Sequence, residues 1–127
     1  MEEKLIEFYK KMGLYNEELF NKIKDNTMII DSELPEFYGV FLKNDNSFEI
    51  VLPKINSIKD ELIWVHEYAH IINLEGGELF ANIMESEYIN MYIEDKTPII
   101  EETIKEIERS KSEEHTLAKK VKLSRIR

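Results

Sequence analysis

The sequence contains no cysteine. Without thiol groups the chain can form neither a disulfide framework nor a thiolate metal site, and it has no cysteine nucleophile. Any zinc ion would therefore have to be bound by histidine and carboxylate side chains. The lack of cysteine also fits a protein of a reducing compartment.

Long apolar runs are absent as well. No stretch approaches the roughly 18 apolar residues of a membrane-spanning helix, and the first residues lack the order of a signal peptide. We therefore expect a cytoplasmic protein with no membrane partner. Its 127 residues, of which 43% are hydrophobic, are expected to form one domain over 1–127 around a single core.

Positive charge is scarce, because 17 Lys and Arg face 26 Asp and Glu and give a net charge of −9. A surface of this sign repels a phosphate backbone, so direct nucleic-acid binding is not expected. Five basic residues and no acidic residue lie in 119–127. We interpret this tail as a solvated terminal helix that offsets the acidic residues before it, the alternative being a docking site for an acidic partner.

The most informative stretch is His66-Glu67-Tyr68-Ala69-His70. Residues four apart on a helix differ by about 40° of rotation, so the imidazoles of His66 and His70 lie side by side as ligands for one metal ion. Glu67 is rotated by about 100° from His66, where its carboxylate can reach a metal-bound water without acting as a ligand. This is the HExxH arrangement of zinc peptidases.

Nearly all other positions in 62–72 are apolar, which predicts a buried helix. Two histidines that pack in a core with ordinary hydrogen bonds are the alternative interpretation. Placing two histidines and a glutamate together on a buried helix is costly unless something pairs with them, and a metal ion supplies that partner. The neighbourhood therefore favours the metal site.

The remaining patterns predict an α+β fold. Helical spacing of apolar residues predicts N-terminal helices in 1–25, and short runs rich in β-branched and aromatic residues predict about three strands in 27–53, the last two as a hairpin. The expected small antiparallel or mixed sheet packs on the motif helix. Two strand aromatics, Phe37 and Phe41, are expected in the core.

A pair of helices is predicted over 57–95, with the metal site between them. Ser57 is a suitable N-cap for the first, and Gly76-Gly77 allow a sharp reversal into the second. Thr97-Pro98 then predicts a final helix that leads into the basic tail over 98–127.

A catalytic zinc ion needs a third protein ligand and an open position for water. The nearby candidates are four carboxylates and one histidine: Glu75, Glu78, Glu85, Glu87 and His115. Glu78 is favoured because it opens the second helix directly after the two glycines. Glu85 is the rival, because a close antiparallel helix pair would bring positions 82–86 opposite the two histidines.

The motif followed by Glu78-x-x-Ala81-Asn82 resembles the gluzincin type of zincin peptidases, most of all the small ImmA/IrrE-type metallopeptidases. The resemblance covers about residues 27–95 and implies a zincin-like fold. It implies one zinc ion bound by His66, His70 and Glu78, with Glu67 as general base. It also implies that Asn82 accepts a hydrogen bond from a ligand imidazole.

This resemblance implies a zinc metallopeptidase that cleaves peptide or protein substrates. It also suggests a narrow regulatory substrate such as a helix-turn-helix repressor, which would be a partner transcriptional regulator. The alternative is a non-catalytic interaction or regulatory protein that retains the scaffold with structural zinc or none. Its support is the short connection of seven residues between His70 and Glu78 and the lack of an assignable oxyanion-stabilising group.

Overall fold

Three short strands form one mixed sheet in the computed structural model, which describes residues 1–127. The strands are β1 (Thr27–Ile30), β2 (Gly39–Leu42) and β3 (Phe48–Pro53), in the order β1-β3-β2. The central strand β3 runs parallel to β1 and antiparallel to β2. The predicted strands and hairpin are confirmed, and a short 3₁₀ helix, η1 (Pro35–Phe37), lies in the connection between β1 and β2.

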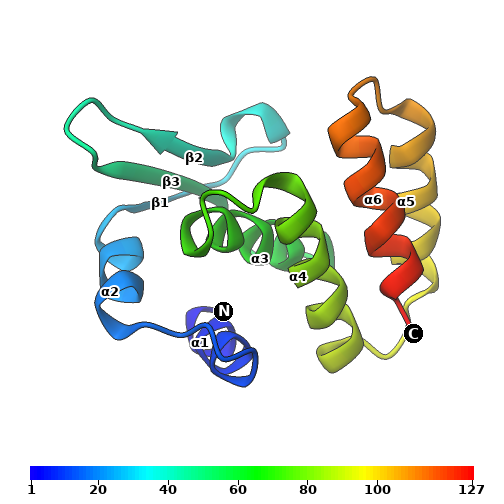
Figure 1. Ribbon diagram of the computed structural model, residues 1–127, viewed down its shortest axis with the longest axis horizontal. Coiled ribbons are helices and arrows are strands. Elements are labelled where there is room, and N and C mark those ends of the chain that lie inside the picture. The colour runs from blue at the N-terminus through cyan, green and yellow to red at the C-terminus, as the bar shows by residue number, and fades with distance from the viewer.

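The sheet packs on the central helix α3 (Ile58–Ile72) through one of its faces. Figure 1 shows the strands lying along one side of this helix. Alternation along β3 buries Ile50 and Leu52. The indole N–H of Trp64 donates to the carbonyl of Pro53 at 2.8 Å and joins the helix to the strand that precedes it.

The aromatic residues of the hairpin region are not in the core, contrary to the prediction. Phe37 is 49% exposed and Phe41 is 48% exposed. Phe41 lies opposite Glu49 in the sheet register, so it points to the face away from the buried Ile50. Phe37 belongs to η1 and lies outside the strands. The aromatic residues of this region therefore did not indicate which face of the sheet packs against the core.

Two N-terminal helices, α1 (Glu2–Lys11) and α2 (Glu17–Asp25), confirm the prediction for 1–25. Their apolar sides join the core around α3. The hydroxyl of Tyr9, a fully buried residue, donates to the backbone carbonyl of Val65 at 2.8 Å. These helices therefore stabilise the side of α3 that does not carry the histidines.

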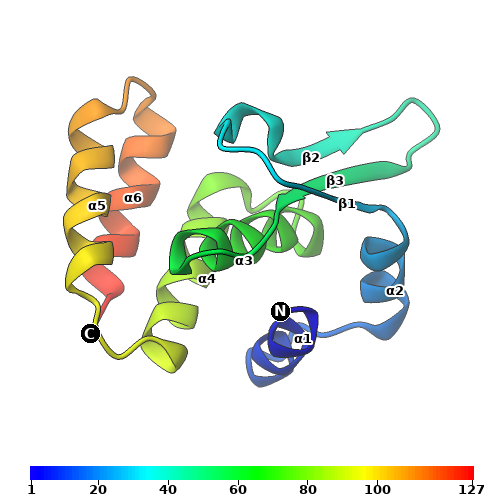
Figure 2. The same cartoon turned by 180° about the vertical axis from the view of Figure 1, so that it is seen from behind.

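The C-terminal part is a helical hairpin and not the single helix that was predicted over 98–127. After α4 (Gly77–Tyr92), the chain forms α5 (Thr97–Arg109) and α6 (Glu113–Arg125), which lie side by side in Figures 1 and 2. The break is at Ser112, whose Oγ accepts the backbone N–H of His115 and caps α6. Ser112 followed by Glu113 and Glu114 is a typical helix start, and it accounts for the second helix of the hairpin.

The basic residues of 119–125 belong to α6, which packs against α4 and α5, and Arg127 follows the end of this helix. Lys119 pairs with Glu106 at 2.8 Å, which agrees with the predicted offset of the acidic residues. Lys122 is buried, however, with 5% of its surface exposed. The interpretation as a solvated tail is therefore wrong for this residue.

None of the helices is both long enough and apolar enough to cross a lipid bilayer.

We predict that Tyr9→Phe lowers the free energy of unfolding by about 1–2 kcal/mol, because the buried Val65 carbonyl loses its donor. Urea denaturation followed by circular dichroism measures this change. Tyr15→Phe is the control, since Tyr15 is only partly buried. An equal loss in both variants would show that the Tyr9 hydroxyl has no special role.

Candidate metal centre

The helix α3 places the two motif histidines on one partly buried face. Its N-cap is Ser57, as predicted, and its opposite face is fixed in the core by residues such as Val65 and Ala69. His66 and His70 are therefore held one turn apart with their rings 4.7 Å from centre to centre. Their Nε2 atoms are 3.0 Å apart, so both rings point to the same place.

A tight reversal brings α4 back over these rings. A Cβ atom added at Gly76 would lie 2.5 Å from the Cβ of Phe80, and Gly77 has a φ of +57°. Both positions therefore require glycine. The reversal places Glu78, the first carboxylate of α4, with Oε2 at 3.0 Å from Nε2 of His66 and Oε1 at 3.6 Å from Nε2 of His70.

The distances among these donor atoms fit a metal ion. The Nε2 atoms of His66 and His70 are 3.0 Å apart, and different oxygens of the Glu78 carboxylate lie 3.0 Å from the first and 3.6 Å from the second. Ligand bonds of 2.0–2.1 Å in a tetrahedral site give separations of about 3.3 Å between ligand atoms. The three side chains can therefore bind one metal ion with shifts of a few tenths of an ångström.

Glu67 lies next to this set. A carboxylate oxygen of Glu67 and ring nitrogens of both histidines all lie within 4.8 Å of one another. Burial raises the pKa of Glu67 above its ordinary value, although the nearby histidines oppose this shift when they are charged. A carboxylate with a raised pKa accepts a proton more readily, which suits a general base.

Glu85, the rival third ligand, contacts the other side of the His66 ring. Its Oε2 lies 2.9 Å from Nδ1 of His66, whereas Nε2 is the atom that faces Glu78. A carboxylate on the remote nitrogen fixes the orientation and the tautomer of a metal-binding imidazole. Glu78 therefore lies beside both Nε2 atoms, whereas Glu85 lies beside the remote nitrogen of His66.

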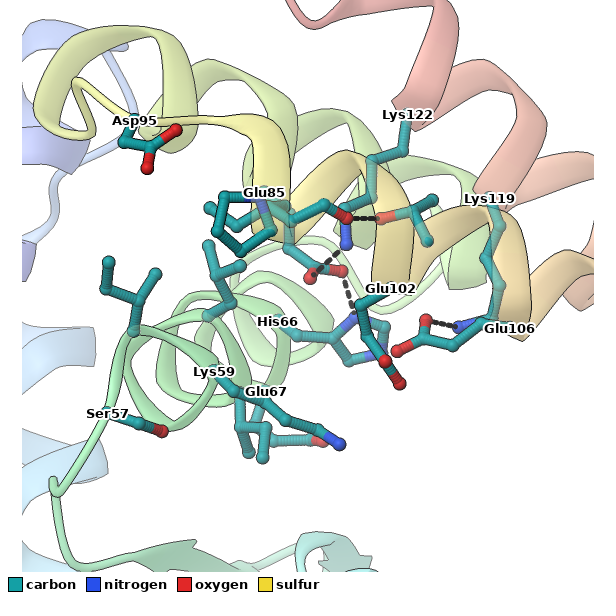
Figure 3. A pocket seen from close by; sticks show the side chains of 16 residues that line it. Ser57, Lys59, His66, Glu67, Glu85, Asp95, Glu102, Glu106, Lys119 and Lys122 are labelled. Carbon is teal, nitrogen blue, oxygen red and sulfur yellow. Dashed lines mark hydrogen bonds and ion pairs between the residues drawn. The ribbon is translucent and has the colours of Figure 1, made fainter.

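Lys122 of α6 donates to Oε1 of Glu85 at 3.1 Å, as Figure 3 shows. Burial raises the pKa of Glu85, but the positive charges of Lys122 and His66 outweigh it and lower the pKa to about 2. Sequence reasoning missed this lysine inside a basic run. Its spacing of four residues from the buried Ala118 is the one local signal that it faces inward.

His115 also reaches the centre, where it contacts Glu78. Its Nε2 lies 3.1 Å from Oε1 of Glu78, and its Nδ1 lies 2.9 Å from the Oγ of Ser112. An Nε2–H that donates to Glu78 and an Nδ1 that accepts from Ser112 satisfy both contacts. The chain has three histidines, and all three contact the carboxylate of Glu78.

The hydrogen bond implied for Asn82 is not present. Its side-chain N–H₂ donates to the backbone carbonyl of Glu78 at 2.9 Å, and its buried Oδ1 has no partner. Glu85 makes the contact with an imidazole Nδ1 in its place. Of the other early candidates, Glu87 pairs with Arg125 at 2.7 Å, away from the histidines, and Glu75 is exposed.

Comparison of the chain with protein-family models, with curated protein sequences and with solved structures found no significant match. The functional assignment therefore depends on the residues and geometry described above.

We predict that Lys122→Met lowers the free energy of unfolding at pH 7 by about 3–5 kcal/mol, because the buried Glu85 keeps only His66 of its two cationic partners. The pKa of Glu85 is lowered in the folded protein, so its contribution is present above the ordinary value of 4.5 and is lost as the pH falls towards about 2. The difference in unfolding free energy between variant and wild type should therefore shrink as the pH falls from 4.5 towards about 2. Urea denaturation at several pH values measures it.

Lys120→Met is the matched control for Lys122→Met, because Lys120 lies exposed on the same helix. It should change the unfolding free energy by no more than about 0.5 kcal/mol. Similar losses for the two lysines would contradict a specific role of the Glu85–Lys122 pair.

A second prediction concerns protons released on metal binding. Burial lowers the pKa of His66, but hydrogen bonds and charges from Glu78 and Glu85 outweigh it and raise the pKa to about 10. His66 is therefore protonated at pH 7.5, and a metal ion must displace that proton. We expect release of at least about one proton, against about a tenth of a proton for an ordinary imidazole.

Calorimetric titration of zinc in buffers of different ionisation enthalpy counts the protons released at pH 7.5. Below the pKa of His66, the affinity for the metal should also rise by about tenfold per pH unit if one proton is displaced. Heats that do not depend on the buffer would show that His66 is neutral before the metal binds.

Proposed function

We propose that the chain is a zinc-dependent metallopeptidase with a zincin-like fold that binds one zinc ion per chain and hydrolyses peptide bonds. The observation that carries this proposal is the convergence of the side chains of His66, His70 and Glu78 with Glu67 beside them. Two imidazoles and one carboxylate, with a further carboxylate free to act as a base, are the minimum set for metal-assisted hydrolysis.

The donor chemistry supports zinc over other ions. Magnesium and calcium favour sites made only of oxygen atoms, whereas two imidazoles and a carboxylate suit zinc or ferrous iron. The donor separations of 3.0–3.6 Å match a tetrahedral zinc site, and the adjacent base favours hydrolysis over oxygen chemistry.

Each side chain then has a defined role. A bound zinc ion supplies a Lewis acid that polarises the peptide carbonyl and lowers the pKa of water. Glu67 takes a proton from the attacking water and delivers it to the leaving amine. Glu85 holds the His66 ring through Nδ1, and Lys122 neutralises Glu85 in turn.

The sheet offers a place for an extended substrate. β2 is an edge strand, and its residues Val40 and Leu42 border a hollow of about 310 Å³ together with Glu67, His70 and Leu74. A peptide that adds to the free edge of β2 would form main-chain hydrogen bonds beside the general base. This mode requires only an extended backbone and so fits a peptide or protein substrate.

The resemblance to ImmA/IrrE-type metallopeptidases extends this proposal to a narrow protein target such as a helix-turn-helix repressor, in the cytoplasm. The second candidate is a non-catalytic interaction protein. The short distances of 3.0 Å from Nε2 of His66 to Glu78 and to His70 also suit an ion pair and a hydrogen bond without metal. Metal content and turnover distinguish the two candidates.

We predict that Glu67→Gln retains one zinc ion per chain but loses peptide hydrolysis by about 10²–10⁴-fold, because only the base is removed. Elemental analysis measures the zinc, and fluorogenic peptides together with candidate repressor proteins measure the turnover. The control is Glu75→Gln, at an exposed position between α3 and α4. It should retain both the zinc ion and the turnover. Equal behaviour of wild type and Glu67→Gln in every assay would favour the non-catalytic protein.

A further inference from the structure

His115 is the one histidine outside the HExxH motif, and it reaches the candidate metal centre from a distant part of the chain. It lies in the first turn of α6, which packs between α4 and α5 (Figures 1 and 2). Its Nε2 is 3.1 Å from Oε1 of Glu78, which lies in the first turn of α4. This contact therefore joins the C-terminal hairpin to the carboxylate of the centre.

Ser112 holds the ring of His115 from the other side. Its Oγ is 2.9 Å from Nδ1 of His115 and accepts the backbone N–H of the same residue at 3.3 Å. A hydroxyl has one proton to donate and can accept two hydrogen bonds, so it can donate to Nδ1 while it caps α6. The proton of the ring is then on Nε2. An ionised carboxylate only accepts, so this is the arrangement that the contact with Glu78 requires.

The two oxygens of Glu78 have different neighbours. Oε2 lies 3.0 Å from Nε2 of His66, whereas Oε1 lies 3.1 Å from Nε2 of His115 and 3.6 Å from Nε2 of His70. A carboxylate that binds zinc through one oxygen leaves a position for water, whereas two bound oxygens would occupy it. A hydrogen bond from His115 to Oε1 therefore favours binding through Oε2 alone.

We propose that His115 is a positioning residue of the metal centre. Its Nε2–H holds Oε1 of Glu78 and leaves Oε2 to bind the zinc ion, while Ser112 holds the ring of His115. The inference rests on the proposed zinc site and adds the group that sets how its carboxylate ligand binds. His115 itself is not a ligand in this arrangement, and the turn between α5 and α6 becomes part of the centre.

Zinc affinity, measured by competition with a chromophoric chelator, tests this without turnover. His115→Ala should bind zinc about tenfold more weakly. Partners of metal ligands contribute about 10–100-fold, and the lower end is expected because the His115 side chain is 48% exposed. His115→Gln should recover most of the affinity, because its amide N–H can donate to the same carboxylate. The matched control is Leu117→Ala, at a residue of the same helix that is 60% exposed, which should bind zinc like the wild type.

Variants of Ser112 test whether the ring must be held. Ser112→Gly removes the hydroxyl but costs the helix cap only a few tenths of a kcal/mol. It should weaken zinc binding, by less than His115→Ala does. Ser112→Thr retains the hydroxyl and should bind zinc like the wild type. Circular dichroism of the metal-free variants checks that each one is folded.

Nitrogen-15 NMR of the zinc-loaded protein gives a readout that a merely structural role does not affect, because it distinguishes protonated from metal-bound ring nitrogens. We expect a proton on Nε2 of His115 and metal on Nε2 of both motif histidines. Metal on a nitrogen of His115 would overturn the inference, since this histidine would then be a ligand.

Cobalt bound in place of zinc reports the number of ligand atoms through its visible absorption. Wild type and His115→Gln should show the stronger absorption of four-coordinate cobalt. His115→Ala should show the weaker absorption of five-coordinate cobalt, because Glu78 can then bind through both oxygens. Identical spectra and identical zinc affinities for wild type and His115→Ala would contradict a positioning role.

Zinc binding and peptide cleavage separate this inference from the proposed function. One zinc ion per chain with turnover that depends on Glu67, but no effect of His115→Ala on zinc affinity, would leave the peptidase and remove the role of His115. Zinc affinity that depends on His115, with no turnover of any peptide or repressor, would leave the positioning residue and remove the peptidase.

Discussion

The candidate centre depends on one carboxylate, Glu78, which lies against all three histidines of the chain. Two of these histidines are fixed by the core-packed helix α3, and the third comes from α6. Glu78 can reach them only because Gly76 and Gly77 permit the tight reversal after α3. The rigid helix and the glycine turn together determine where the donor atoms converge.

Charge balance explains why the C-terminal hairpin belongs to this centre. Glu78 and Glu85 place two negative charges around the His66 ring, and burial of Glu85 without a cation would be strongly unfavourable. Besides the protonated His66, Lys122 supplies a cation from a position 37 residues further along the chain. The chain has a net charge of −9, and three basic residues of α6 form ion pairs with carboxylates of α4 and α5.

Local patterns predicted the parts of the site that depend on helix geometry. The spacing of His66 and His70, the cap at Ser57 and the glycine reversal all involve residues close in sequence, and the structure has them where they were expected. The choice between Glu78 and Glu85 remained open because it depends on how two helices cross. The contacts of Lys122 with Glu85 and of His115 with Glu78 were not predicted, although His115 was a candidate ligand, because they depend on how α6 packs. The exposure of Phe41 was missed because strand alternation does not tell which face is covered.

The position of Glu67 between two hollows relates this geometry to function. On one side the edge of β2 offers backbone groups, which under the proposed function would bind an extended peptide with little regard to its sequence. On the other side lies the cavity under α5 and α6, whose apolar wall is formed by residues of α3 and α5. Main-chain binding alone would give a peptidase of broad specificity, and an apolar cavity alone would give only weak discrimination between similar side chains. Under the proposed function, Glu67 would act on a peptide held along β2, and the cavity on its other side would limit what can lie there.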